Sequence, residues 1–309
     1  MVQKKDIAPI CVITGPTASG KSTLAMEAAV KTGGEIISCD SMQIYKHMDI
    51  GTAKPTNKDR AEIRHHMIDV AEPYDDYSVS LYRDGADAAI SEITERGNKI
   101  YLTGGTGLYI KTLLYKTSLG NAPKDENIRA RLTEILKEHG NEYLYDTLKK
   151  NDPKAAGKLH YNDTKRVIRA LEIAEITNTT KTEVIKGDEA AEEHRYPHKI
   201  YVLNPDRAKL YNDINARVEI MIKDGLFGET ENLLKYGCNP SMNSMKAIGY
   251  AESIRYLNGE LKKEDAIRLI QQKTRNYAKR QMTFFRGFKN AVFLPITEIG
   301  IKKCLKTVL

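Results

Sequence analysis

Short apolar runs recur along the chain, and each one is followed by glycine, asparagine or small polar residues. Such runs occur at residues 10–13, 36–37, 100–102 and 198–203. Runs of this length, bounded by turn residues and separated by segments with helical spacing, are typical of buried parallel strands. The pattern therefore predicts an α/β fold in which a parallel sheet is flanked by helices.

Residues 120–197 depart from this pattern because they are highly charged and contain no convincing strand. Stretches such as DENIRARLTEILKEHG and DTKRVIRALEIAEIT place their apolar residues at helical steps of three and four. We therefore expect an α/β core, residues 1–119 and 198–309, with an inserted all-helical lobe at 120–197. A kinase lid and a nucleic-acid clamp both remain open as roles for this lobe.

A long amphipathic helix is predicted for residues 265–286, where apolar residues recur at three- and four-residue steps. The opposite face carries a stripe of basic side chains, namely Arg268, Arg275, Lys279 and Arg286. One such stripe suits the phosphate backbone of a nucleic acid, although an ordinary solvated face is the alternative.

Composition narrows the setting without deciding the function. The 309 residues contain 48 Lys and Arg against 41 Asp and Glu, a formal net charge of +7. The N-terminus has no apolar signal region, and no run approaches the roughly 20 apolar residues of a membrane span. We therefore expect a cytoplasmic protein without a membrane segment. The four cysteines are far apart in sequence, which argues against a disulfide framework and a zinc site.

The stretch GPTASGKS, residues 15–22, follows the first apolar run directly and has the spacing of a phosphate-binding loop. In such a loop, backbone N–H groups at a helix N-terminus converge on phosphate oxygens, and the glycines allow close approach. Lys21 supplies a positive charge, and the Ser22 hydroxyl is the expected ligand of Mg²⁺. The loop specifies a polyphosphate without specifying which molecule carries it.

Two further strand ends are expected at the same edge of the sheet. The run at 36–37 leads to Asp40 and Ser41, and the run at 100–102 leads to the turn Thr103–Gly107. Ligands of open α/β sheets lie beyond the carboxyl ends of the strands, so these groups should share one crevice with the loop. An ATPase would close one strand with a metal-binding Asp. Here the metal contact must come from Ser22, with Asp40 as a further candidate, or the loop serves another chemistry.

Seven sequence motifs, which extend over nearly the whole length of the chain, occur in the order that is found in a known protein family. They are GPTASGKS, DSMQIYKHMDIGTAKP, HHMID, LTGGTGLY, RVIRALEI, MKAIGYAE and YAKRQMTFFR. With them the chain resembles the tRNA dimethylallyltransferases, also called tRNA isopentenyltransferases, in the bacterial form that lacks a zinc finger. The resemblance implies a P-loop kinase-like core.

The same resemblance implies an activity and its partners. The family transfers a dimethylallyl group from dimethylallyl diphosphate to N6 of the adenine immediately 3′ of the anticodon in tRNA, and pyrophosphate leaves. The implied partners are the tRNA anticodon stem-loop and dimethylallyl diphosphate, with Mg²⁺ as cofactor, and we expect a monomer.

Residue roles follow at the matching positions. Asp40 is similar to the family's general base, Thr106 lies near the chemistry, and Arg217 grips the diphosphate. The diphosphate loop matches Gly15, Thr17, Ala18, Ser19, Gly20, Lys21 and Ser22. The positions that match tRNA contacts are Asp40, Ser41, Met42, Gln43, Arg129, Lys165, Arg166, Val167, Ile168, Arg169, Lys246, Ala247, Ile248, Gly249, Tyr250, Lys279, Arg280, Gln281 and Arg286. Among the tyrosines, Tyr250 is the candidate for stacking on a base.

Three other functions compete with this interpretation. The first is a P-loop kinase that transfers a phosphoryl group from ATP to a small molecule, and the second is a prenyltransferase that acts on free adenine nucleotides. The third is a non-catalytic RNA-binding protein that uses a nucleotide as a switch. The basic lobe and helix favour tRNA as the acceptor, and the absence of a strand-terminal Asp argues against the kinase.

Overall fold

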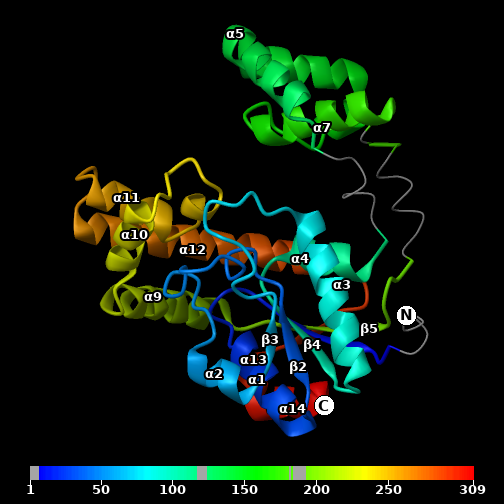
Figure 1. Ribbon diagram of the computed structural model, residues 1–309, viewed down its shortest axis with the longest axis vertical. Helices are drawn as coiled ribbons and strands as arrows, with labels where there is room; N and C mark the ends of the chain where they lie inside the picture. Colours follow the sequence, from blue (N-terminus) through cyan, green and yellow to red (C-terminus); the bar gives the residue numbers. More distant parts are fainter. Residues whose placement is uncertain (1–6, 117–123, 181, 184–192) are drawn as a thin grey trace. The chain divides into compact units, whose positions relative to one another are not determined.

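The chain consists of two compact units, Met1–Leu114 with Tyr196–Leu309 and Tyr115–Arg195. The structure is a computed structural model, and it describes residues 7–116, 124–180, 182–183 and 193–309 (Figure 1). The first unit contains the sheet, and the second unit is the helical lobe. The sequence predicts this lobe at 120–197, and residue 120 lies outside the described residues.

The first unit is built on a six-stranded sheet with the order β3-β2-β4-β1-β5-β6. All its described strand pairs are parallel. The strands are β1 (Ile10–Thr14), β2 (Glu35–Ser38), β3 (His65–His66), β4 (Ile100–Gly104), β5 (His198–Leu203) and β6 (Val292–Leu294). The predicted α/β fold with a parallel sheet is therefore confirmed, while β3 and β6 were not predicted because two or three residues carry no periodic pattern.

The carboxyl ends of the central strands are held together by bonds beyond the regular ladder. The Thr14 hydroxyl donates to the carbonyl oxygen of Gly104 at 2.8 Å, and the Cys39 N–H donates to that of Thr103 at 2.7 Å. As a result, the segments that follow β1, β2 and β4 begin from one edge of the sheet. This edge is where the candidate site forms.

Helices flank the sheet (Figure 1). Helix α1 (Lys21–Thr32) and helix α14 (Ile301–Val308) share a core with strand residues such as Ile13, Ile36 and Tyr101. Helix α3 (Val79–Glu95) packs against β2 and β4 and against α4 (Gly107–Leu114). The short helices α2 (Asn57–Glu62) and α13 (Ile296–Ile299) complete this part of the unit.

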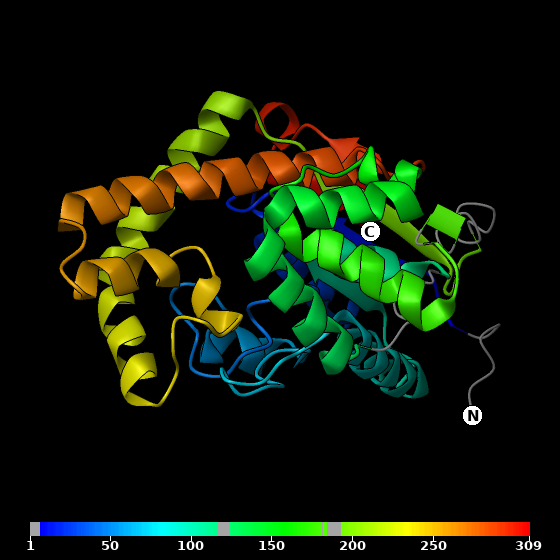
Figure 2. The same cartoon turned by 90° about the horizontal axis from the view of Figure 1, so that it is seen from above.

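The remainder of the first unit is helical. It contains α9 (Arg207–Lys223), α10 (Leu226–Lys235), the 3-10 helix η3 (Ser244–Lys246), α11 (Tyr250–Leu257) and α12 (Lys263–Phe285). Figure 2 shows α12, the long orange helix, running from α11 back toward the sheet. One apolar core joins these helices to the loop after β2, because Ile44 and Met48 pack with Val218, Leu226 and Ile270.

The helix predicted at 265–286 is confirmed as α12, but its basic stripe is only partly free. Arg268 forms an ion pair with Asp265 at 2.5 Å, so an acidic partner does accompany the stripe. Arg275 is half-buried and donates to the Asn215 side-chain oxygen at 2.5 Å. Arg268, Lys279 and Arg286 are exposed.

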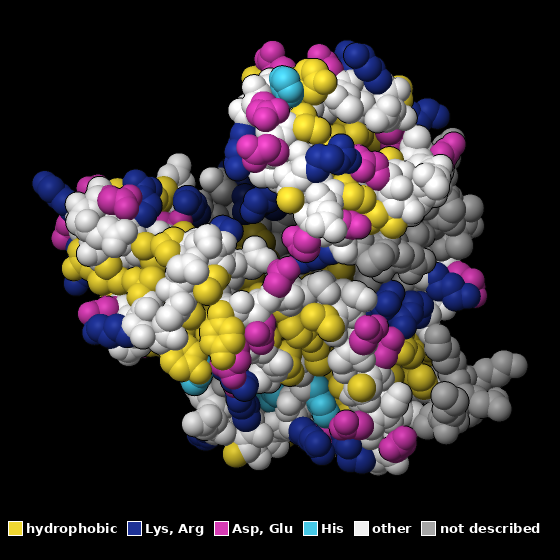
Figure 3. Space-filling model, turned by 45° about the horizontal axis from the view of Figure 1, so that its top comes forward, with side chains coloured by type: hydrophobic (Ala, Val, Ile, Leu, Met, Phe, Trp, Pro, Cys, Tyr) yellow, Lys and Arg dark blue, Asp and Glu magenta, His cyan; other side chains and the backbone are white. Residues whose placement is uncertain are grey.

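The described part of the lobe contains α5 (Glu126–Asn151), α6 (Pro153–Ala156) and α7 (Thr164–Thr177). Its core contains Leu132, Leu144 and Leu148 of α5 and Leu171 of α7. Gly140 interrupts α5 with φ 82° and ψ 176°, a conformation that only glycine adopts readily. Figure 3 shows acidic and basic side chains interspersed over the lobe.

A buried ion-pair cluster connects the helices of the lobe. The fully buried Glu172 carboxylate accepts from the Arg129 guanidinium at 2.8 and 3.0 Å and from the Arg169 guanidinium at 2.7 Å. It also accepts the Asp125 N–H at 2.9 Å. Although burial raises the pKa of Glu172, these hydrogen bonds bring it below its usual value. The cluster therefore holds an ionised carboxylate inside the lobe.

Replacing Glu172 by glutamine is expected to lower the free energy of unfolding of the lobe by about 3 kcal/mol. The glutamine amide is uncharged, so the guanidinium groups of Arg129 and Arg169 lose the negative charge that pairs with them inside the lobe. Amide hydrogen exchange within α5 and α7 would measure the loss. Glu134→Gln is the control, because that carboxylate is exposed and pairs with Lys137 on the surface, where such pairs contribute little. Equal exchange rates in both variants would contradict the expectation.

Candidate active site

The loop between β1 and α1 has the geometry that phosphate binding requires. A Cβ on Gly15 would lie 3.0 Å from the Leu203 carbonyl oxygen, so the close approach to β5 needs glycine there. Gly20, at φ 85°, turns the chain into α1. The Ser19 hydroxyl is buried in the loop and has no hydrogen-bond partner among the described residues. The Lys21 ammonium is also buried and donates to the Pro16 carbonyl oxygen at 3.2 Å.

A cavity of about 610 Å³ opens beside this loop. Its walls include Lys21 and Ser22 from α1, Asp40 after β2, Gly104 at the end of β4 and Arg217 from α9. Ser22 is exposed at the start of α1. The groups predicted to share one crevice at the sheet edge are therefore together in the structure.

A second cavity of about 330 Å³ is lined by segments predicted to contact tRNA. Its walls include Ser41 and Met42, the run 246–250 and Arg280. Residues that line both cavities are Thr17, Asp40, Thr52, Arg217 and Tyr277. Asp40 consequently stands where the phosphate-loop cavity and the second cavity meet.

Positive charge dominates the junction of the cavities. Burial, and to a smaller extent the neighbouring Arg217, lower the pKa of Lys21 to about 8, while Asp40 acts in the opposite direction. Burial also lowers the pKa of Arg217, and Asp40 again opposes this effect. Two partly desolvated cations with one carboxylate leave the site short of negative charge, so an anionic ligand such as a diphosphate would be stabilised there.

Binding of an anionic substrate is expected to weaken as the pH rises through about 8. Lys21 is charged below its lowered pKa and neutral above it, so the loop loses one cation on the alkaline side. The pH dependence of kcat/KM reports groups of the free enzyme, and it should show this alkaline limb. Lys21→Arg should remove the limb because guanidinium stays charged. A limb that persists in Lys21→Arg would assign it to another group.

Asp40 and Thr106 are positioned by one set of backbone hydrogen bonds. The Asp40 carboxylate accepts the Met42 N–H at 2.9 Å. Thr106 accepts the Ser41 N–H on its hydroxyl at 3.0 Å, and its own N–H donates to the Cys39 carbonyl oxygen at 3.0 Å. The turn after β4 is thereby tied to the segment after β2, so Thr106 is bonded to Cys39 and Ser41, the two residues that flank Asp40.

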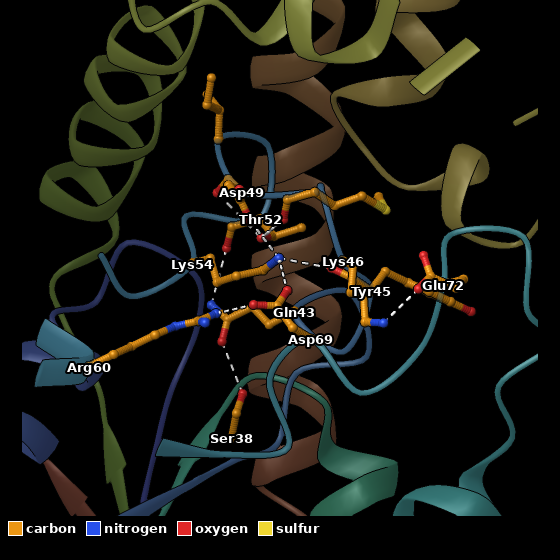
Figure 4. A network of polar contacts seen from close by, with 12 residues as sticks. Ser38, Gln43, Tyr45, Lys46, Asp49, Thr52, Lys54, Arg60, Asp69 and Glu72 are labelled. Carbon is orange, nitrogen blue, oxygen red and sulfur yellow. Dashed lines mark hydrogen bonds and ion pairs between the residues drawn. The ribbon is translucent and has the colours of Figure 1, made fainter. Parts of the chain in front are cut away.

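The long loop 40–55 is held by polar contacts among its own residues and with Asp69 (Figure 4). The Lys54 side chain is almost fully buried, and its ammonium donates to the Tyr45 carbonyl oxygen at 2.8 Å, to Asp49 at 2.6 Å and to Asp69 at 2.7 Å. Gln43 donates to the carbonyl oxygens of Thr52 and Ala53 at 3.2 and 3.3 Å. This network gives the loop that carries Asp40 a fixed conformation.

Known proteins match this chain over most of its length. The IPP transferase family profile matches residues 43–288, and the isopentenyl transferase profile matches residues 8–73. The tRNA dimethylallyltransferase of Pelotomaculum thermopropionicum is 46% identical over 292 residues, which are 94% of this chain and 92% of the relative. That of Acetivibrio thermocellus is 43% identical over 290 residues, again 94% and 92%. The chain belongs to the tRNA dimethylallyltransferase family.

Solved structures agree with this family. The full-length tRNA isopentenylpyrophosphate transferase of Bacillus halodurans matches with a TM-score of 0.72 and 38% identity, covering 97% of this chain and 94% of that one. A eukaryotic dimethylallyltransferase acting on tRNA matches with a TM-score of 0.76 and 28% identity, covering 94% and 75%. The resemblance and the kinase-like α/β core predicted from the sequence are thus confirmed.

Some of the residues predicted to contact tRNA have side chains that are exposed to solvent. The exposed basic side chains among them are Lys165, Arg166, Lys246, Lys279, Arg280 and Arg286. Others have partners inside the protein. Arg129 and Arg169 bind Glu172, and Val167 is buried in the core of the lobe.

The prediction that Tyr250 stacks on a base is wrong. The Tyr250 ring is fully buried at the start of α11, and its hydroxyl donates to the Glu229 carboxylate at 2.6 Å. A ring enclosed in this way cannot stack on a base. The same carboxylate accepts the N–H groups of Asp49, Ile50 and Gly51, so Tyr250 belongs to the support of the loop 40–55.

No helix in the described part of the chain combines the length and the hydropathy that crossing a bilayer requires. Within the same residues, no cluster of three or more His, Cys, Asp or Glu side chains is placed to hold a metal ion.

Proposed function

We propose that this tRNA dimethylallyltransferase moves a dimethylallyl group from dimethylallyl diphosphate to N6 of the adenine immediately 3′ of the anticodon, working as a monomer. One observation carries the proposal: the cavity of the phosphate loop and the cavity lined by residues 246–250 meet at Asp40. A donor and an acceptor that approach from different cavities would come into contact beside a carboxylate.

The donor occupies the larger cavity. Backbone N–H groups of the phosphate loop and the charges of Lys21 and Arg217 hold the diphosphate. As the allylic C–O bond breaks, its electron pair moves onto the bridging oxygen, and the leaving diphosphate gains negative charge. Donors already aimed at that charge stabilise the transition state more than the ground state.

Mg²⁺ fits the residues at this loop. The Ser22 hydroxyl is exposed and lines the cavity beside Lys21, and Mg²⁺ is commonly bound through substrate phosphates with few protein ligands. When bound there, the ion neutralises charge on the diphosphate. Ser22 would be its protein ligand.

The acceptor adenine occupies the smaller cavity, with its N6 amine at Asp40. The nitrogen lone pair forms the new N–C bond, and the Asp40 carboxylate accepts the proton that N6 loses. Thr106 accepts the Ser41 N–H and keeps the segment that carries Asp40 in place. To reach such a cavity, the base must leave the stack of the anticodon loop.

The tRNA backbone is bound by exposed basic side chains of both units. Lys165 and Arg166 lie at the start of α7 in the lobe, and Lys279, Arg280 and Arg286 lie at the end of α12. Lysine and arginine at such positions neutralise phosphates and release counterions. These contacts favour tRNA over a free nucleotide as the acceptor.

Mass spectrometry of tRNA nucleosides tests the reaction. Unmodified tRNA is incubated with the protein, Mg²⁺ and either dimethylallyl diphosphate or ATP, with AMP as an alternative acceptor. We expect a dimethylallyl mass on adenosine in tRNA with the allylic donor only. ATP consumption without added mass would support a kinase, modified AMP would support a nucleotide prenyltransferase, and unchanged RNA would support a binding protein.

A further inference from the structure

Gln281 has an unusual place among the residues of α12. Its neighbours Lys279 and Arg280 are exposed, whereas Gln281 is 5% exposed. The side chain leaves the helix on the face that carries Tyr277, four residues earlier, and lines the larger cavity. A buried primary amide requires hydrogen-bond partners, so what it binds indicates what it does.

The amide joins two loops of the active site. Its Oε1 accepts the N–H of Thr17 in the phosphate loop at 2.9 Å. Its Nε2 donates to the carbonyl oxygen of Gly105, in the turn after β4, at 3.0 Å. The fit against the turn is close, because a Cβ on Gly105 would lie 2.2 Å from Nε2. Three segments distant in sequence are thus tied by one side chain.

The chemistry of the two bonds requires an amide. A carboxylate of the same shape accepts at Thr17 but cannot donate to Gly105, and a methionine of similar length can form neither hydrogen bond. The turn that Gln281 holds continues into Thr106, which binds the segment of Asp40. The distance between the phosphate loop and the turn after β4 therefore depends on Gln281.

We propose that Gln281 is a positioning residue that sets the phosphate loop against the Gly105 turn, so that the donor is held in register with Asp40. The inference rests on the proposed function. It differs from the role implied by the resemblance, in which residue 281 contacts tRNA. With the amide engaged twice inside the protein, tRNA affinity should not depend on it.

Steady-state kinetics of Gln281→Met and Gln281→Glu distinguish the two roles. Loss of buried hydrogen bonds to both loops should raise KM for dimethylallyl diphosphate about tenfold or more and lower kcat. The Kd for tRNA should change less than about twofold. Gln272→Met, at an exposed position of the same helix, is the matched control and should resemble the wild type. Thermal unfolding of each variant shows whether the fold is kept.

Gly105→Ala tests the same contact from the other side. The added methyl group displaces the amide of Gln281, so this variant should also raise KM for the donor. Because both changes break one linkage, the double variant Gly105→Ala/Gln281→Met should be no worse than the poorer single variant.

Two outcomes would overturn the inference. One is a tRNA Kd that rises in Gln281→Met while KM for the donor stays unchanged. The other is additive loss in the double variant. If the wild-type protein itself transfers nothing to tRNA, the proposed function fails, and that result is separate from either outcome.

Discussion

Asp40→Asn is expected to lower kcat for dimethylallyl transfer by about 10²- to 10⁴-fold, the usual contribution of a general base. Asparagine keeps the size of the side chain and can still accept the Met42 N–H, so the loop should retain its conformation. What it cannot do is accept the proton that N6 loses. The loss should therefore appear in the chemical step, measured by single-turnover transfer to tRNA.

Asp40→Asn is expected to affect the binding of pyrophosphate differently from catalysis. Asp40 partly offsets the charges of Lys21 and Arg217, so its removal leaves the phosphate loop more positive. Pyrophosphate should bind to Asp40→Asn as well as to the wild type or better. Because Asp40 raises the pKa of Lys21, the alkaline limb of donor binding should also move to lower pH.

The control for this prediction is Asp84→Asn, a change at an exposed carboxylate of α3. It should leave both kcat and pyrophosphate binding unchanged. Should Asp40→Asn lose pyrophosphate binding together with activity, the residue would be a part of the donor site, and another group would have to accept the proton.

The parts of the site that the sequence could predict are those coded within a short segment. The phosphate loop needs adjacent residues only, and Asp40 and Thr106 follow from the rule that parallel strands end at one edge. The long helix α12 was likewise predicted because its apolar spacing extends over more than twenty residues. Each of these depends on local pattern and on one general rule of topology.

The parts that could not be predicted depend on partners distant in the chain. Whether Arg129 contacts RNA or protein is decided by Glu172, 43 residues away, and nothing near either residue indicates the pair. Tyr250 is enclosed because Glu229 and Gly51 meet it from two other segments. A sequence shows that a side chain can bind, and only the packing shows what it binds.

Gln281 is an intermediate case. Its spacing from Tyr277 and Phe285 places it on the inward face of α12, which the helical pattern alone could indicate. The pattern could not indicate that its partners are Thr17 and Gly105. Motif matching alone assigned the whole run 279–281 to tRNA, although successive residues of a helix point in different directions.

The triple variant Lys279→Ala/Arg280→Ala/Arg286→Ala is expected to weaken tRNA binding by about 10²- to 10³-fold at physiological salt. Each side chain is exposed at the end of α12, and Arg280 lines the smaller cavity beside Tyr277. If all three neutralise phosphates, the plot of log K against log salt should become shallower by about two to three. Pyrophosphate binding should be unchanged, since none of the three lines the larger cavity.

The matched control removes the same charge from another surface. Lys302→Ala/Lys303→Ala/Lys306→Ala lies on exposed positions of α14 and lowers the net charge equally. Long-range attraction depends on net charge, whereas counterion release depends on direct contact with phosphates. An unchanged salt slope in the control with a reduced slope in the α12 variant would therefore locate the contacts on α12. Equal reductions in both variants would contradict the proposed interface, because the charge would then act without contact.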